Sequence, residues 1–177
     1  MIVETERLVL RPFNVDDVKA VLAFGSNPKV IAQTGDKIIN TKKEALDIIN
    51  NVWLKEYNSI GYGRYAVVYK PDNKVIGFSG LKFEKEFNAT DIGYRFLPSY
   101  WGLGIATESS LPFIKMGFEN FGLEEIVGVA FESNKASLRV LTKLGMRLRT
   151  TGDFFDNGQI CKWYSITKAE YDTKRHQ

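Results

Sequence analysis

Cysteine and histidine are nearly absent from this sequence, which has one of each in 177 residues. The cysteine, Cys161, has no partner for an internal disulfide, which fits a reducing compartment, and we expect a cytoplasmic protein with Cys161 buried in a strand. The histidine, His176, stands next to the C-terminus, so Ser-His-Asp and Cys-His catalysis are excluded unless the tail supplies the base. Zinc ligands of these two types are also too few for a cluster, and no metal is expected.

Long apolar runs are missing as well. None approaches the roughly 18 residues that a membrane helix requires, and residues 1–7 lack the apolar region of a signal peptide. A net charge of +3 fits an anionic small ligand but is far from the basic stripe of a nucleic-acid-binding protein. The length suits one domain, because a chain of this size buries about 70% of its unfolded surface without disulfides or metals. We therefore expect a single domain, residues 1–177, that binds neither nucleic acid nor membrane.

The spacing of apolar residues predicts helices and strands in a definite order. Asn14 and Thr41 are expected to cap two helices, and the second carries an apolar stripe of Ala45, Ile48, Ile49, Val52 and Trp53. Further helices are predicted near residues 104–120 and 135–144, and strands at residues 5–13, 64–69, 75–83, 91–97 and 126–131, followed by two strands joined through the turn Asp156-Asn157-Gly158. An antiparallel meander of three strands, followed by helix, strand, helix and two final strands, predicts a mixed α/β sheet in a layered domain, with a β-α-β unit at its centre.

A glycine-rich segment connects the third of these strands to the next helix. Its residues are Trp101, Gly102, Leu103, Gly104, Ile105, Ala106 and Thr107. Small residues at every second position allow a ligand to approach the backbone, and the first amides of a helix favour an anion such as pyrophosphate. A tight turn that needs glycine for its backbone angles is the simpler interpretation of the glycines alone. The segment lacks the Gly-Lys-Ser/Thr ending of a P-loop, and its spacing differs from that of the dinucleotide fingerprint.

Several separate motifs resemble the GNAT acyltransferase superfamily. Its Gln/Arg-x-x-Gly-x-Gly/Ala pattern falls on Trp101, Gly104 and Ala106, so the first position departs from the pattern. A tryptophan followed by glycine is usual in the branch of ribosomal-protein N-terminal acetyltransferases. The same branch is resembled by the opening residues 4–12, by Asn134-Lys135-Ala136-Ser137 and by residues 141–146, whereas Ile92-Gly93-Tyr94 together with the glycine segment resembles the acetyl-CoA motif of the whole superfamily. The resemblance covers nearly the whole chain in the right order.

The resemblance implies both a fold and an activity. The fold is a mixed, mostly antiparallel sheet of about seven strands, splayed between the fourth and fifth and flanked by about four helices. The activity is direct transfer of an acetyl group from acetyl-CoA to a primary amine, with no metal. The branch suggests the N-terminal α-amine of a protein, such as a ribosomal protein, as the acceptor, while polyamines, amino acids and aminoglycosides remain open. A catalytically silent CoA-binding module is an alternative, and loop spacing argues against a nucleotide-dependent oxidoreductase.

Most of the site residues are likewise implied by the resemblance. The amides of residues 103–107 are expected to hold the pyrophosphate of the cofactor, and Trp101 and Gly102 lead into them. The remaining contacts with the cofactor are assigned to the backbone near Phe96 and Leu97, which meets the pantetheine arm and the thioester oxygen, to Asn134, which also caps its helix, and to Arg139 and Lys143. Arg139 and Lys143 form a basic stripe with Lys135, for which a solvated face is the default interpretation.

The residues for proton transfer are Ser137, Asp91 and Asp153. Many members of the superfamily protonate the leaving thiolate with a tyrosine where this chain has Leu141, so Ser137 is assigned the role of general acid. For the general base, Asp91 and Asp153 are candidates, with solvated turn or strand-end acids, and water, as alternatives. Glu84 and Glu86 are expected to be solvated strand ends, and Glu108 to face away from the phosphates. Pro112 should bend the helix that follows the glycine segment.

Overall fold

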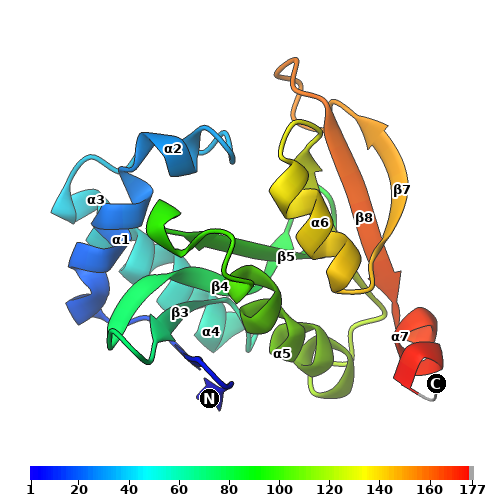
Figure 1. Cartoon of the computed structure of the whole chain (residues 1–177), viewed down its shortest axis with the longest axis horizontal. Helices are drawn as coiled ribbons and strands as arrows, with labels where there is room; N and C mark the ends of the chain where they lie inside the picture. Colours follow the sequence, from blue (N-terminus) through cyan, green and yellow to red (C-terminus); the bar gives the residue numbers. More distant parts are fainter. Residues whose placement is uncertain (176–177) are drawn as a thin grey trace.

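One mixed sheet organises the structure, a computed structural model that describes residues 1–175. Over these residues the sheet has eight strands in the order β1-β2-β3-β4-β5-β6-β8-β7 (Figure 1). The strands are β1 (Val3–Glu4), β2 (Leu8–Arg11), β3 (Arg64–Tyr69), β4 (Lys74–Glu84), β5 (Ala89–Phe96), β6 (Glu125–Phe131), β7 (Arg147–Gly152) and β8 (Cys161–Thr167). His176, which the sequence analysis singled out, lies outside the described residues.

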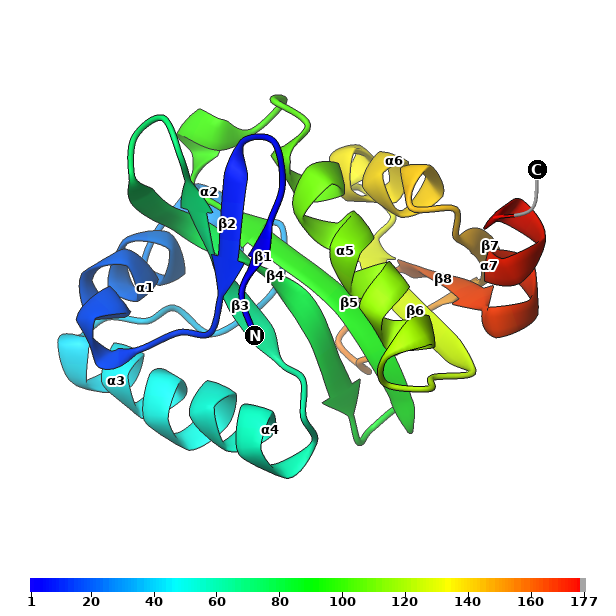
Figure 2. The same cartoon turned by 90° about the horizontal axis from the view of Figure 1, so that it is seen from below.

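Helices cover both faces of the sheet, as Figure 2 shows. The helices are α1 (Val18–Gly25), α2 (Pro28–Ile31), α3 (Lys42–Ile48), α4 (Leu54–Ser59), α5 (Ile105–Glu119), α6 (Lys135–Lys143) and α7 (Lys168–Arg175). One face, including Ala66 and Phe78, packs against α1 and the α3–α4 segment. The other, including Val67 and Leu81, packs beneath α5. Strands β3 and β4 direct their side chains to both cores, which makes the layered arrangement that the sequence predicted.

The start of each early helix follows from its capping residue. Asn14 caps the 3-10 turn Val15–Asp17 that leads into α1, and Thr41 caps α3. Both form capping boxes: the side chain accepts an amide hydrogen bond within the first turn, and the carboxylate three residues later accepts one from the amide of the capping residue. Between α3 and α4 the helix continues as a π-helical turn, Ile49–Trp53. The wider turn rotates the predicted apolar stripe, so that Ile49 and Trp53 are buried but Val52 is exposed.

The central strands confirm the predicted meander and the β-α-β unit. β3, β4 and β5 are antiparallel neighbours. β5 then pairs in parallel with β6 at one position only, Asp91 with Val127, and α5 makes the crossover between them. Beyond that position the two strands diverge toward their C-terminal ends. The sequence analysis did not predict the short edge strand β1, so β5 and β6 correspond to the fourth and fifth predicted strands.

The C-terminal part departs from the sequence prediction in two places. The last two strands are antiparallel as expected, but residues 153–160 join them in a longer loop than a two-residue hairpin, with Asp156 and Gly158 at positive φ. Helix α7 follows β8 and was not predicted. Cys161 is a buried residue of β8, as expected, and Pro112 lies inside α5. No helix in the described part of the chain is long and apolar enough to cross a membrane.

Candidate active site

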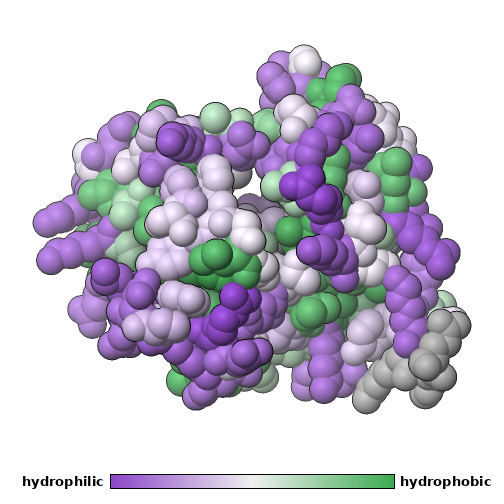
Figure 3. Space-filling view, in the orientation of Figure 1, coloured by the Kyte–Doolittle hydropathy of each residue, from purple (hydrophilic) through white to green (hydrophobic). Residues whose placement is uncertain are grey.

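A cavity of about 810 Å³ lies between the diverging strands β5 and β6, beside the N-termini of α5 and α6. In Figure 3 the surface is hollowed at this place, between the side of the molecule that carries α1 and α2 and the side that carries α6 and β8. The predicted site residues that line it are Asp91, Phe96, Trp101, Gly102, Gly104, Ile105, Ala106, Thr107, Asn134, Ser137, Arg139 and Lys143. Leu97, Leu103 and Asp153 are not among the lining residues.

The N-terminus of α5 opens onto the cavity without a capping side chain. Gly104 is its N-cap residue with φ of 79°, and Gly102 has φ of 76°; both angles lie in the left-handed region that favours glycine. Asn14, Thr41 and Asn134 cap their own helices with side-chain oxygens, but no side chain caps α5. The first amides of α5 are therefore left to a ligand, and the helix dipole favours an anion there.

The carboxylate of Glu108, in the first turn of α5, is held by the N-terminal segment, residues 5–7. Its Oε1 accepts hydrogen bonds from the Thr5 hydroxyl at 2.6 Å and the Arg7 amide at 2.9 Å, and its Oε2 accepts one from Arg7 Nε at 2.7 Å. Partial burial acts to raise the pKa of Glu108, but these hydrogen bonds and the charge of Arg7 outweigh it and lower the pKa. Arg7 Nη2 lies 3.7 Å from the place that a Cβ on Gly104 would occupy, so this ion pair flanks the uncapped helix end.

The edge of β5 that faces the cavity has backbone groups that no neighbouring strand uses. In the antiparallel ladder with β4, Leu97 donates its amide to Ile76 O at 3.0 Å, so alternate residues such as Tyr94 and Phe96 direct their backbone groups to the opposite edge. Strand β6 reaches that edge only at Asp91. The Phe96 carbonyl accepts the indole N–H of Trp101 at 2.8 Å, whereas the Tyr94 and Phe96 amides face the gap.

Leu97 is placed differently from its neighbour Phe96. Its amide is held by Ile76, and its carbonyl accepts the Tyr100 amide at 3.0 Å. Its side chain packs in the core on the α1 face of the sheet. The backbone of Leu97 is thus used within the chain, and the free backbone groups near the gap belong to Tyr94 and Phe96.

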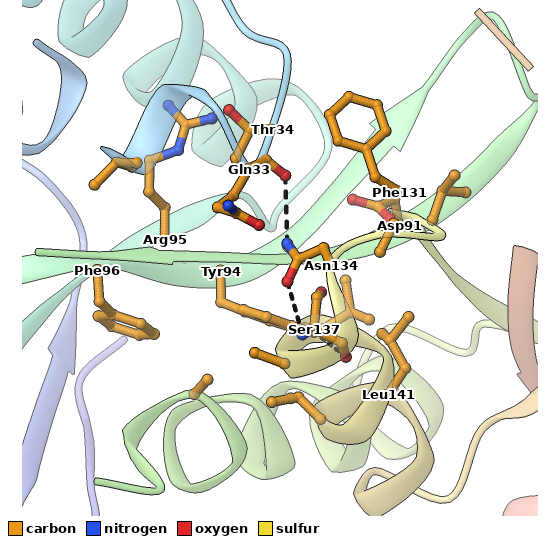
Figure 4. A pocket seen from close by; sticks show the side chains of 18 of the residues that line it. Gln33, Thr34, Asp91, Tyr94, Arg95, Phe96, Phe131, Asn134, Ser137 and Leu141 are labelled. Atoms are coloured by element: carbon orange, nitrogen blue, oxygen red, sulfur yellow. Dashed lines mark hydrogen bonds between the residues drawn. The ribbon is translucent and has the colours of Figure 1, made fainter. Parts of the chain in front are cut away.

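Asn134 and Ser137 stand together at the start of α6 (Figure 4). Asn134 Oδ1 accepts the Ser137 amide at 3.1 Å, which makes Asn134 the N-cap, and its Nδ2 donates to Gln33 O at 3.3 Å. The Ser137 hydroxyl lies 2.8 Å from the hydroxyl of Tyr94, which also donates to the Ser137 carbonyl at 3.1 Å. Burial raises the pKa of Tyr94, so this phenol stays protonated.

Asp91 lies on the other face of β5 from Tyr94. Its Oδ2 accepts a hydrogen bond from Arg64 Nη2 at 2.7 Å, and the guanidinium also donates to the Asp91 carbonyl at 3.1 Å. Burial raises the pKa of Asp91, and the attraction of Arg64 opposes this shift without cancelling it. In Figure 4, Asp91 and Phe131 are drawn on one side of the β5 ribbon, and Tyr94 and Ser137 on the opposite side.

Asp153 begins the loop between β7 and β8 and organises it. Its Oδ1 accepts the amides of Phe155 and Asn157, each at 3.2 Å, and its Oδ2 accepts the amide of Gly158 at 2.6 Å. Hydrogen bonds from these loop amides, that of Gly158 first, lower the pKa of Asp153. A carboxylate with its oxygens occupied and its pKa lowered is a weak proton acceptor.

Most of the chain matches the model of a known protein family. The profile of the acetyltransferase (GNAT) domain matches residues 7–147. The chain belongs to the GNAT acetyltransferase family. As a GNAT protein it is an N-acetyltransferase, and the sheet with a gap between β5 and β6 is the fold expected from the resemblance.

Several known proteins are similar to this GNAT chain. The uncharacterized N-acetyltransferase YoaA of Bacillus subtilis (strain 168) is 29% identical over 147 residues, covering 82% of each chain. A ribosomal-protein-S5-alanine acetyltransferase from Vibrio fischeri has a TM-score of 0.81 at 20% identity, covering 95% of this chain and 97% of its own. A spermidine N-acetyltransferase from Vibrio cholerae, solved with CoA and spermine, has a TM-score of 0.76 at 17% identity, covering 94% and 99%. At these identities the two structures show a shared fold.

Sequence reasoning missed some residues that the GNAT cavity brings together. Tyr94 was quoted only as part of a motif, although its place two residues after the buried Ile92 puts it on the α5 and α6 face. Arg64, which pairs with Asp91, begins a strand far away in the sequence, and nothing local predicts the contact. The same holds for Gln33, whose carbonyl meets Asn134 across 101 positions.

Proposed function

We propose that this GNAT chain transfers the acetyl group of acetyl-CoA to a primary amine inside the cavity between β5 and β6. The observation that supports the proposal is the meeting of three features in one cavity: the uncapped N-terminus of α5, the unpaired edge of β5, and the hydroxyl of Ser137. The first fits a pyrophosphate, the second fits an amide-bearing arm that adds to the sheet, and the third is a proton donor between them.

Residues for holding acetyl-CoA are present along the whole cavity. The amides of residues 103–107 suit its phosphates, and Arg139 and Lys143 of α6 line the same end with two positive charges. The free amides of Tyr94 and Phe96 suit the carbonyl groups of the pantetheine arm and of the thioester. When bound, acetyl-CoA supplies an acetyl group activated as a thioester. Arg7 contributes positive charge beside Gly104 although it is already paired with Glu108.

Ser137 is the proposed general acid, and Tyr94 is proposed to position it. The two hydroxyl groups lie within hydrogen-bond distance and either can donate; with the phenol as donor, the serine hydroxyl hydrogen is free to point at a sulfur atom in the gap. Burial keeps Tyr94 protonated, so the phenol remains a hydrogen-bond donor, and its proposed role is to orient the serine. Leu141, where many relatives have an acidic tyrosine, is buried beneath this pair. A phenol thus reaches the site from β5 instead of from α6.

Asp91 is the proposed general base on the acceptor side of β5. Its raised pKa brings it closer to neutrality than a solvated aspartate, which is what a base needs at physiological pH. The acceptor ammonium loses one proton before attack and a second after the C–N bond forms, and the sulfur gains one as the C–S bond breaks. One proton is released overall. With Asp91 on one face and Ser137 on the other, deprotonation and reprotonation take place on opposite sides of the strand.

The resemblance to the ribosomal-protein branch makes a protein N-terminus one candidate acceptor, and small amines are the other. The named relatives include one protein for each class, so similarity alone does not separate them. The test is release of free CoA thiol from acetyl-CoA in the presence of a panel of N-terminal peptides, polyamines and simple primary amines. Turnover with at least one amine is expected. Absence of turnover with the whole panel, in a sample that binds CoA by calorimetry, would reduce the chain to a CoA-binding module.

A further inference from the structure

The two ends of the cavity differ in chemistry. Backbone amides and the cations of α6 line the end next to α5. The other end, which we call the aromatic half, is lined by three phenylalanines from separate parts of the chain: Phe87 between β4 and β5, Phe131 at the end of β6, and Phe155 in the loop between β7 and β8. None of these three residues has a role in the proposed acetyl transfer. Their convergence on one cavity needs a separate explanation.

The rings of the aromatic half are held in place from behind. Phe87 contacts Phe155 edge-on with ring centroids 5.5 Å apart, and contacts Trp163 of β8 at 5.1 Å. Phe155 is nevertheless 44% exposed. The Asp153 carboxylate accepts the Phe155 amide and two others, so the loop that carries this ring is fixed by hydrogen bonds. Asp153 thereby gains a positioning role at the cavity.

The aromatic half has too few unpaired negative charges to match a polycation. Three carboxylates that line it are already paired: Asp36 with Arg95, Glu84 with Lys82, and Asp91 with Arg64. Glu86 also lines the cavity, and no ion pair holds it among the described residues. The lining at this end therefore carries one negative charge in excess. A ligand with a single positive charge matches it, and a polyamine with three or four does not.

We propose that the aromatic half binds the acceptor as an arylalkylamine, a small molecule with one ammonium group on a short alkyl chain attached to an aromatic ring. The inference rests on the proposed acetyl transfer and names the substrate class for it. The ring of the acceptor packs edge-on or offset against Phe87 and Phe155. Its ammonium group is drawn to the excess negative charge, and lies within reach of Asp91 and of the aromatic faces, which attract cations.

The test compares acceptors of matched amine chemistry. CoA release is followed with 2-phenylethylamine, n-butylamine, spermidine and a peptide with an N-terminal alanine. The expected kcat/KM for 2-phenylethylamine exceeds each of the others by about tenfold or more, the size of effect that aromatic contacts and one buried ring supply. Phe155→Ala is expected to raise KM for 2-phenylethylamine by about tenfold while leaving that for n-butylamine nearly unchanged.

The matched control is Phe154→Ala. Phe154 is the neighbouring residue of the same loop and packs on Trp163 at 5.4 Å, but it does not line the cavity. It should leave the preference between the two amines unchanged, which separates loss of a binding ring from loosening of the loop. A binding measurement with 2-phenylethylamine in the presence of CoA should show the same dependence on Phe155.

The outcomes distinguish the two levels of the proposal. Faster turnover of spermidine or of the alanine peptide than of 2-phenylethylamine overturns the substrate class but leaves acetyl transfer standing. Equal turnover of 2-phenylethylamine and n-butylamine, or equal effects of Phe154→Ala and Phe155→Ala, also overturns it. Turnover of no amine at all overturns both the substrate class and the transfer.

Discussion

The hydroxyl groups of Tyr94 and Ser137 lie 2.8 Å apart and join β5 to the first turn of α6. This contact spans the gap in the sheet on the side of the uncapped α5 helix. The same phenol donates to the Ser137 carbonyl, so it restrains both the backbone and the side chain of the serine. The arrangement predicts that the two residues act as a unit.

A double-mutant cycle tests that unit. Ser137→Ala should lower kcat by about a hundredfold, the low end for general acid catalysis, because thiolate is a good leaving group. Tyr94→Phe should lower kcat by about tenfold, the value of one lost hydrogen bond, with KM for acetyl-CoA nearly unchanged. In the double variant the losses should not add, since Tyr94 acts through the serine. Additive losses would show that the two residues act independently. Full activity of Ser137→Ala from about pH 6 to about pH 9 would leave Ser137 as an ordinary helix residue.

The pH dependence of kcat/KM tests Asp91. Burial raises its pKa, so the acid limb contributed by a base at this position should lie above the ordinary aspartate value of 3.8. Asp91→Asn should remove that limb and lower the rate by roughly a hundredfold at pH 7, while the amide oxygen still accepts from Arg64. Asp153→Asn, outside the cavity, is the control and should keep the limb. An unaltered limb in Asp91→Asn would assign deprotonation to water.

The proposal that the N-terminus of α5 binds the cofactor phosphates is tested at two glycines that both have positive φ. Gly104→Ala places a Cβ at the N-terminus of α5, where only Arg7 lies nearby. Gly122→Ala places a Cβ in open space at φ of 63°, away from the cavity. Both variants should lose about 1 kcal/mol of stability to the left-handed backbone. Only Gly104→Ala should also weaken CoA binding by calorimetry. Equal affinity in the two variants would contradict the assignment.

The stability of the fold near the site should depend on Glu108. Its pKa is lowered from the ordinary 4.5, so the stabilisation it provides is present above that value and is lost as the pH falls through the lowered pKa. Glu108→Gln should therefore cost about 1.5 to 3 kcal/mol of unfolding free energy at neutral pH, the range for hydrogen bonds to a charged group. The difference from the wild type should shrink in acid. Glu6→Gln, at an exposed neighbour, should have little effect at any pH.

Local chemistry explains which parts of the structure the sequence predicted. Asn14, Thr41 and Asn134 act within three residues of themselves, so their helices were placed correctly. The glycine segment was also predictable, because positive φ at Gly102 and Gly104 is a property of those residues. The splay between β5 and β6 came from resemblance and not from any local pattern.

Contacts between distant segments account for what the sequence did not predict. The π-helical turn that exposes Val52 depends on how the whole helix packs. The partner of Asp91 is Arg64, and the partner of Ser137 is Tyr94, each brought near by strand register. Asp153 was a candidate base because the ribosomal-protein branch carries an acid near this turn, and in the structure the turn amides occupy its carboxylate.

The divergence of β5 from β6 has a consequence for hydrogen exchange. Strands β1–β5 and strands β6–β8 are joined by a single residue pair, Asp91 with Val127. Beyond this pair, the amides of Tyr94 and Phe96 have no strand to bond with. They should exchange with solvent deuterium far faster than buried amides in neighbouring strands. An arm that adds to this edge would protect those two amides and leave the rest of the chain little changed. The exchange rates of these two amides would then report whether the cavity is occupied.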